Sequence, residues 1–117
     1  MTIPQAIALC QTFSDAYLDY PFGPEWAVMR HGEGGKSFAL IYERSGLPCI
    51  NLKAEPVEVV VLSQAYRAIC PGYHMNKRHW LTVVLDDSVP QGLLADLVAQ
   101  SYRLTLPKNK GRQNQEK

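Results

Sequence analysis

The sequence has few of the features that mark a secreted, membrane-bound or metal-binding protein. It contains only 3 cysteines in 117 residues, and none forms a Cys-x-x-Cys pair. This predicts free thiols and argues against a disulfide framework or a zinc site. We expect Cys10 and Cys49 to be buried and Cys70 to be the more exposed thiol. No run approaches the roughly 18 consecutive apolar residues of a membrane span, and no signal peptide precedes the first predicted helix, so we expect a cytoplasmic protein.

A strong excess of one charge is also missing. The 12 Lys and Arg residues and 11 Asp and Glu residues give a net charge of +1. Residues 107–117 contain four basic residues and one acidic residue, 4 − 1 = +3, so the remaining chain has 8 − 10 = −2. Because nucleic-acid-binding domains usually present a basic surface, any contact with a polyanion must come from a local patch.

The length suits one domain, which we expect over residues 1–106, followed by a disordered basic tail over 107–117. A first helix is predicted from a capping box of Thr2 and Gln5, with apolar residues at helical spacing as far as about Tyr17. Tyr20-Pro21-Phe22-Gly23-Pro24 then ends it. Strands are predicted over 26–31, 36–43 and 48–53, with a glycine-rich turn at Glu33-Gly34-Gly35.

Two further helices are predicted. Pro56 suits the first turn of one, whose apolar positions Val57, Val60, Val61 and Ala65 fit one face. The alternative is a strand, since residues 59–62 include three β-branched valines. The other begins at Ser88-Val89-Pro90, and its buried stripe comprises Leu93, Leu94, Leu97, Val98, Ser101 and Tyr102. A strand lies between the two helices, within residues 73–85.

The resulting order, α-β-β-β-α-β-α, predicts an α+β two-layer sandwich with helices on one face of an antiparallel sheet and the other face open. Alternation along the strands predicts which side chains face the helices. Ile50, Leu52, Leu81, Val83 and Leu85 are expected in the core. Asn51, Lys53, Arg78, Trp80 and Thr82 are expected on the open face, unless a bulge reverses the pattern.

The candidate binding element is the segment 73–80. Lys77 and Arg78 can neutralise phosphates. His74 and Asn76 can form hydrogen bonds to phosphates or base edges, and Tyr73 and Trp80 offer stacking surfaces. The alternative is a turn whose charges are solvated and whose Trp80 belongs to the core.

Several motifs resemble the signature of the MmcQ/YjbR family. They are Tyr20-Pro21-Phe22-Gly23, Lys36-Ser37-Phe38-Ala39, Ile50-Asn51-Leu52-Lys53, Pro71-Gly72-Tyr73-His74-Met75-Asn76-Lys77-Arg78-His79-Trp80 with the following Thr82-Val83 and Leu85-Asp86, and Ser101-Tyr102. The resemblance covers the chain to about Leu106. It implies a frataxin-like (CyaY-like) fold and a double-wing DNA-binding protein, with Lys53, His74, Asn76, Lys77 and Arg78 in the matching motifs.

Other patterns do not support catalysis or metal binding. His74 and His79 are five residues apart, which suits neither a strand face nor a helix face for shared metal ligation. Asp15 and Asp19 have the i, i+4 spacing of a helix, but two carboxylates are too few for an iron-binding ridge. Residues 32–35 lack the Gly-Lys-Ser/Thr of a phosphate loop. We therefore expect a non-enzymatic DNA-binding protein without a cofactor, monomeric by default. The alternative is a binding module for a protein or a small anionic ligand.

Overall fold

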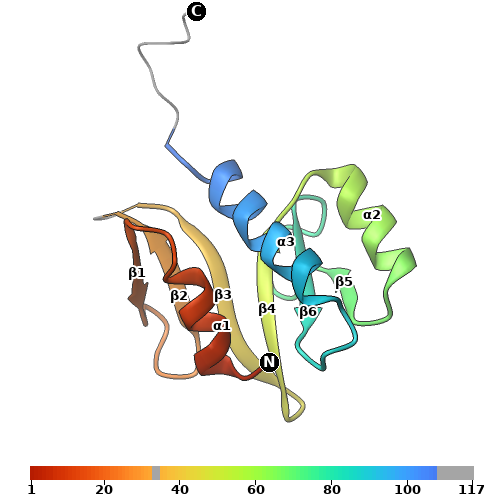
Figure 1. Cartoon of the computed structure of the whole chain (residues 1–117), viewed down its shortest axis with the longest axis horizontal. Helices are drawn as coiled ribbons and strands as arrows, with labels where there is room; N and C mark the ends of the chain where they lie inside the picture. Colours follow the sequence, from red (N-terminus) through yellow and green to blue (C-terminus); the bar gives the residue numbers. More distant parts are fainter. Residues whose placement is uncertain (33–34, 108–117) are drawn as a thin grey trace, which may run out of the picture.

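The computed structural model describes residues 1–32 and 35–107 (Figure 1). The elements are α1 (Ile3–Cys10), β1 (Ala16–Asp19), β2 (Ala27–His31), β3 (Ser37–Arg44), β4 (Leu47–Lys53), α2 (Pro56–Ala65), β5 (Ile69–Pro71), β6 (Trp80–Val84) and α3 (Gln91–Leu104). Residues 33–34 of the predicted turn and residues 108–117 of the predicted tail lie outside the described residues. No helix in the described chain is long and apolar enough to cross a membrane.

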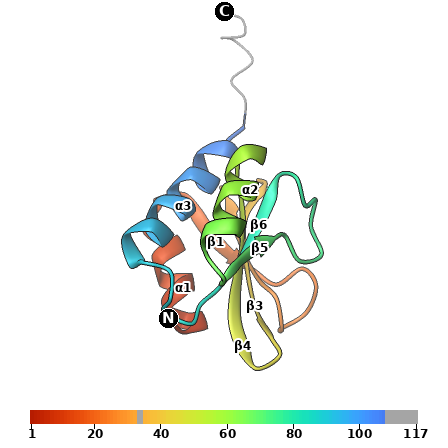
Figure 2. The ribbon, with the colours of Figure 1, turned by 90° about the vertical axis from the view of Figure 1, so that its right-hand side faces the viewer.

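The six strands form one antiparallel sheet in the order β1-β2-β3-β4-β6-β5. Figure 2 shows α1 and α3 on one side of this sheet, while two long loops lie toward the other side. All three helices contribute to a single core, through residues such as Ala6, Val59 and Leu97. The predicted α+β class with two layers is therefore confirmed.

The first helix is shorter than predicted. Its capping box is present, because Gln5 N donates to Thr2 Oγ1 at 3.2 Å and Thr2 N donates to Gln5 Oε1 at 2.9 Å. The helix ends at Cys10, however, and Tyr17 lies in β1. Phe13 reaches the core from a turn, where it stacks on Tyr102 with ring centroids 4.2 Å apart. The four-residue spacing of Phe13 and Tyr17 matches a helix, although a turn and a strand produce it here.

Two short strands, β1 and β5, were not predicted. Strands of 4 and 3 residues are too short to display a clear alternation. As a consequence, Asp15 and Asp19 do not share a helix face. Asp15 precedes β1, and Asp19, at the end of that strand, forms an ion pair with Arg30 at 3.6 Å.

A bulge changes which β3 residues face the helices. Arg30 pairs with Ser37 and Met29 pairs with Ala39, so Phe38 is the extra residue between them. Phe38 and Ala39 both belong to the helix-side core. Leu40 and Tyr42 lie on the opposite side, which we call the second face of the sheet.

The pattern predicted for β4 and β6 is confirmed. Ile50, Leu52, Leu81 and Val83 belong to the helix-side core, as does Leu85 after the strand. Asn51 pairs with Thr82, and Lys53 pairs with Trp80, so these alternate residues occupy the second face. That face is nevertheless not open throughout, because Asn51 and Thr82 are fully buried.

The second helix is confirmed, and the alternative that this segment is a strand is wrong. The prediction of which side of the helix is buried is also wrong. Val59 is 2% exposed, whereas Val57, Val60 and Val61 are 68%, 56% and 54% exposed. Val59 and Leu62, three positions apart, are the residues that meet the core. The run of four apolar residues fits more than one helical face, so its pattern cannot select the inward one.

The third helix buries Leu94, Leu97, Val98 and Ser101, as predicted. Ser101 connects this helix to two strands. Its Oγ donates to Phe38 O in β3 at 2.6 Å and accepts a hydrogen bond from Lys53 N in β4 at 2.9 Å. A single hydroxyl therefore satisfies two backbone groups and fixes α3 over the centre of the sheet.

Candidate functional site

A buried polar network occupies the centre of the second face. Tyr42 Oη and Thr82 Oγ1 each donate to Asn51 Oδ1 at 2.7 Å, while Asn51 Nδ2 donates to Tyr73 O at 2.9 Å. Tyr73 N completes the network by donating to Thr82 Oγ1 at 2.9 Å. Burial raises the pKa of Tyr42 to about 12, so the phenol remains a donor at neutral pH. Asn51, predicted to face outward, thus anchors a loop instead of meeting a ligand.

Aromatic rings cover this network. The Trp26 ring stacks on Tyr42 with centroids 4.1 Å apart, and the Tyr73 ring lies 5.8 Å from Tyr42. His74 lies 4.0 Å from Tyr73, between it and Trp26. The guanidinium of Arg44 stands over Tyr73, with Cζ 4.0 Å from the ring centroid. Trp26 and Arg44 were not predicted as site residues, since only the sheet register brings them here.

The loop 72–79 is held in a defined shape. Gly72 N donates to Trp80 O at 2.8 Å, which closes the loop at its base, and Trp80 N donates to Asn76 O at 3.0 Å. Asn76 also accepts a hydrogen bond from Arg78 N, at 2.9 Å, through its side chain. Asn76, predicted as a contact residue, therefore supports the turn that precedes Arg78. A loop fixed in this way loses little entropy on binding a partner.

The basic residues of the predicted site differ in whether their side chains already have a hydrogen-bond partner. Lys77 Nζ donates to Gly72 O at 2.8 Å, so part of its role is to close the loop. The side chains of Arg78 and Lys53 have no hydrogen-bond or ion-pair partner in the part of the chain that the structure describes. Across residues 1–32 and 35–107, no carboxylate lies within ion-pair distance of Arg44, Lys53, Lys77 or Arg78. Their charges remain available for an anion.

Trp80 is partly exposed on the second face, outside the helix-side core, which contradicts the alternative that it belongs to that core. It pairs with Lys53 across β4 and β6. A Cβ added at Gly72 would lie 2.8 Å from Trp80 Cβ, so the chain passes too close for a side chain at position 72. The Pro71-Gly72 pair thus lets the loop begin directly beside Trp80.

An open pocket of about 360 Å³ lies where the loop 72–79 meets the loop 20–26. Its lining residues are Phe22, Trp26, Ser37, Leu40, His74 and Met75, and we call it the aromatic pocket. Phe22 is 69% exposed, and Leu40 is nearly buried at 6%. His74 has a positive φ of 59°, which is uncommon for a residue other than glycine and recurs at functional positions.

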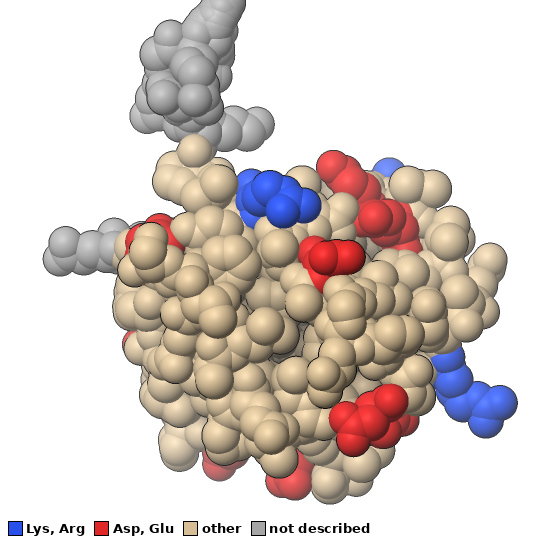
Figure 3. Space-filling view, in the orientation of Figure 1, with Lys and Arg blue, Asp and Glu red and all other residues tan. Residues whose placement is uncertain are grey.

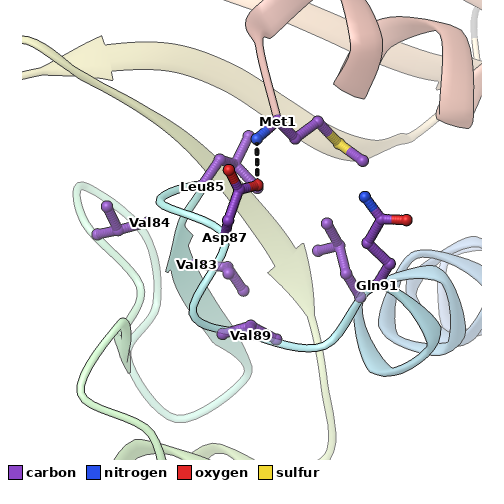
Figure 4. A pocket seen from close by; sticks show the side chains of 8 residues that line it. Met1, Val83, Val84, Leu85, Asp87, Val89 and Gln91 are labelled. Carbon is purple, nitrogen blue, oxygen red and sulfur yellow. Dashed lines mark hydrogen bonds and ion pairs between the residues drawn. The ribbon is translucent and has the colours of Figure 1, made fainter.

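Two other hollows are less suited to a ligand. The space beside Met1 has about 10 Å³, close to the volume needed for a single water, and the ion pair of the N-terminus with Asp87 at 2.7 Å borders it (Figure 4). The groove between α2 and α3 is crossed by a hydrogen bond from Gln100 to Glu58. Nowhere in residues 1–32 and 35–107 do three His, Cys, Asp or Glu side chains gather in a potential metal site.

The chain is similar in sequence to known proteins. The chain is 44% identical to YbdF of Escherichia coli O157:H7 over 89 residues, which are 76% of this chain and 71% of YbdF. It is 30% identical to YjbR of Escherichia coli K12 over 103 residues, 88% of this chain and 86% of YjbR. Both matches extend over most of the globular part.

Solved structures match over nearly the whole chain. The crystal structure of Deinococcus radiodurans protein DR2400 has a TM-score of 0.83 and 34% identity, covering 96% of this chain and 85% of that one. A Pseudomonas syringae protein has a TM-score of 0.80 and 31% identity, covering 91% of this chain and 100% of that one. The model of the YjbR family itself matches residues 11–104. The chain therefore belongs to the YjbR family.

Proposed function

We propose that this chain is a DNA-binding module without catalytic activity, which contacts phosphates through the loop 72–79 and the adjoining second face. The observation that carries the proposal is a group of four cations, Arg44, Lys53, Lys77 and Arg78, none of which is neutralised by a carboxylate of the described chain. They adjoin the rings of Tyr73 and Trp80, which can pack against sugars and bases. The double-wing arrangement that the family resemblance implies remains a prediction.

The charge distribution supports a local contact. On the helix-covered face, acidic side chains are scattered among isolated basic ones (Figure 3). Since the chain before residue 107 has a net charge of −2, long-range attraction to DNA is weak. Binding would then depend on the few cations of the second face, and each would have a measurable effect.

Arg78 gives the sharpest test, because its side chain has no partner among the described residues and its exchange should leave the fold intact. We expect Arg78→Gln to weaken binding to a labelled duplex and to reduce the slope of log K against log salt by about one. Fluorescence anisotropy between about 50 and 200 mM salt measures this slope. Arg103→Gln, at the exposed end of α3, is the matched control and should leave the slope unchanged.

Equal effects of Arg78→Gln and Arg103→Gln would place the contact elsewhere. Duplex binding that is undetectable at low salt, or insensitive to salt, would contradict the proposal as a whole. Lys77→Gln is a weaker test, because that change also removes the hydrogen bond to Gly72.

A binding module for a small anionic ligand is the second candidate. The aromatic pocket favours it, because a volume of about 360 Å³ lies within the range of small-molecule sites and contact with a DNA backbone requires no such recess. A ligand that raises the melting temperature of a protein with no affinity for DNA would favour this candidate.

A further inference from the structure

The aromatic pocket contains polar and apolar groups that the fold itself does not use. Ser37 and His74 have no side-chain hydrogen bond to any described residue, although both line the pocket. Phe22 leaves 69% of its surface exposed and lies outside the core. Apolar walls with a small number of convergent polar groups are typical of a ligand site.

The chemistry of the lining selects a planar ring. Phe22 and Trp26 offer aromatic surfaces, while Leu40 and Met75 provide apolar contact. The Ser37 hydroxyl and the His74 imidazole can each donate or accept a hydrogen bond. A flat heteroaromatic ring with donors and acceptors along its edge satisfies both kinds of group, which a lipid chain or a simple anion cannot do.

The basic residues around the pocket favour a ring that is linked to phosphate. Lys77 and Arg78 follow Met75 by two and three residues in the same loop. On the other side of His74, the ring of Tyr73 carries the guanidinium of Arg44 at 4.0 Å. A ligand with its ring in the pocket would therefore have cations in the same loop and beside the neighbouring ring of Tyr73.

We propose that the aromatic pocket binds an unpaired nucleobase that is attached to phosphate. The inference rests on the proposed function and deepens it, because a base that is stacked and paired in a duplex must first be flipped out to enter a recess, whereas an unpaired base can enter directly. The ligand is then a single-stranded segment or a free nucleotide. The duplex would be held outside the pocket, by the contacts of the loop 72–79 and the adjoining second face.

The test compares a short single-stranded DNA of mixed sequence with its duplex in an anisotropy assay. Phe22→Ala is the informative variant, since an exposed ring outside the core can be removed without unfolding the chain. We expect it to weaken binding of the single strand roughly 5- to 100-fold, the usual effect of losing a stacking ring, and to leave duplex binding unchanged. Val57→Ala on α2, at a valine that is 68% exposed, is the matched control and should alter neither.

A second arm separates the two sources of the base. The four deoxynucleoside monophosphates are titrated individually, and the amide NMR signals of Ser37, Leu40 and Met75 are followed. Shifts at these positions that disappear in Phe22→Ala support the pocket even if no oligonucleotide binds, an outcome that would overturn the proposed function alone. Duplex and single-strand binding that both persist unchanged in Phe22→Ala would overturn the pocket alone. Absence of binding to nucleotides, single strands and duplex would overturn both.

Discussion

The side-chain amide of Asn51 donates a hydrogen bond to the backbone carbonyl of Tyr73 at 2.9 Å, and so ties the loop 72–79 to the middle of the sheet. The same side chain accepts hydrogen bonds from two hydroxyls. A residue that pattern analysis places on an open surface is therefore the internal support of the candidate site. Its contribution can be measured separately from ligand binding.

We expect Asn51→Ala to lower the free energy of unfolding by about 2–4 kcal/mol, because it removes the acceptor of the Tyr42 and Thr82 hydroxyls and the donor to the Tyr73 carbonyl. Urea denaturation measures the change. Tyr42→Phe removes only one donor and should cost about 1 kcal/mol. Similar losses for the two variants would show that the network does not act through Asn51.

His31 should make stability depend on pH. Its Nε2 lies 2.7 Å from Thr105 Oγ1, and that hydroxyl donates to Ser101 O at 2.7 Å, so Nε2 carries the proton. Among residues 1–32 and 35–107 no hydrogen-bond partner reaches Nδ1, which lies 3.8 Å from Asp15 Oδ2. Burial lowers the pKa of His31 below 6.5, although Asp15 and a backbone hydrogen bond at Tyr102 oppose this shift.

The direction in which stability changes with pH follows from proton binding. Below pH 6.5 the unfolded chain takes up a proton at His31 that the folded chain resists, so the free energy of unfolding should fall as pH decreases through this range. Denaturation midpoints between about pH 5 and 8 test this. His31→Gln keeps a donor for Thr105 without the titration, and its profile should be flatter. An unchanged slope in that variant would assign the pH dependence to other groups.

The valines of α2 should differ sharply in their contributions to the free energy of unfolding. Val59→Ala is expected to lower the free energy of unfolding by about 1.5–3 kcal/mol, because it leaves a cavity in the core. Val60→Ala, on the exposed side, should change it by less than about 0.5 kcal/mol. Thermal denaturation of both variants distinguishes this orientation of the helix from the reverse, in which Val60 would be the costly position.

The three thiols should react in a fixed order. Cys10 and Cys49 are free and buried, as predicted, and burial raises the pKa of Cys10 to about 12. Cys70 is partly exposed in the edge strand β5. Since the thiolate is the reactive form, we expect iodoacetamide to label Cys70 first and Cys10 only after unfolding. Peptide mass spectrometry before and after denaturation reads the order, and early labelling of Cys10 would contradict it.

The regular elements could be predicted because their buried residues repeat. Ile50 and Leu52 alternate along a strand, and Leu94, Leu97 and Val98 follow a helical period. The pattern failed where one spacing fits two structures, as for Phe13 and Tyr17, or where several faces are apolar, as in α2. The bulge at Phe38 changes which side chains of β3 point toward the helices, and nothing in the local sequence marks the bulge.

The candidate site could be predicted only in its contiguous part. Residues 73–80 are predicted as a site because basic, polar and aromatic side chains are clustered there. In the sequence, more than one strand separates Trp26 and Arg44 from that segment. Only the pairing of β2, β3, β4 and β6 brings Trp26 close to His74 and Arg44 close to Tyr73. The supporting roles of Asn51 and Asn76 depend on hydrogen-bond geometry, which composition does not contain.

The sheet ends at β1 on one side and at β5 on the other. Unpaired edge strands are where sheets of separate molecules join, and such joining is an early step toward aggregation. Here β5 has 3 residues and ends at Pro71, which has no N–H to offer a passing strand, while β1 has 4 residues. These short edges limit growth of the sheet from one molecule to the next, which would help the chain stay dispersed at high concentration.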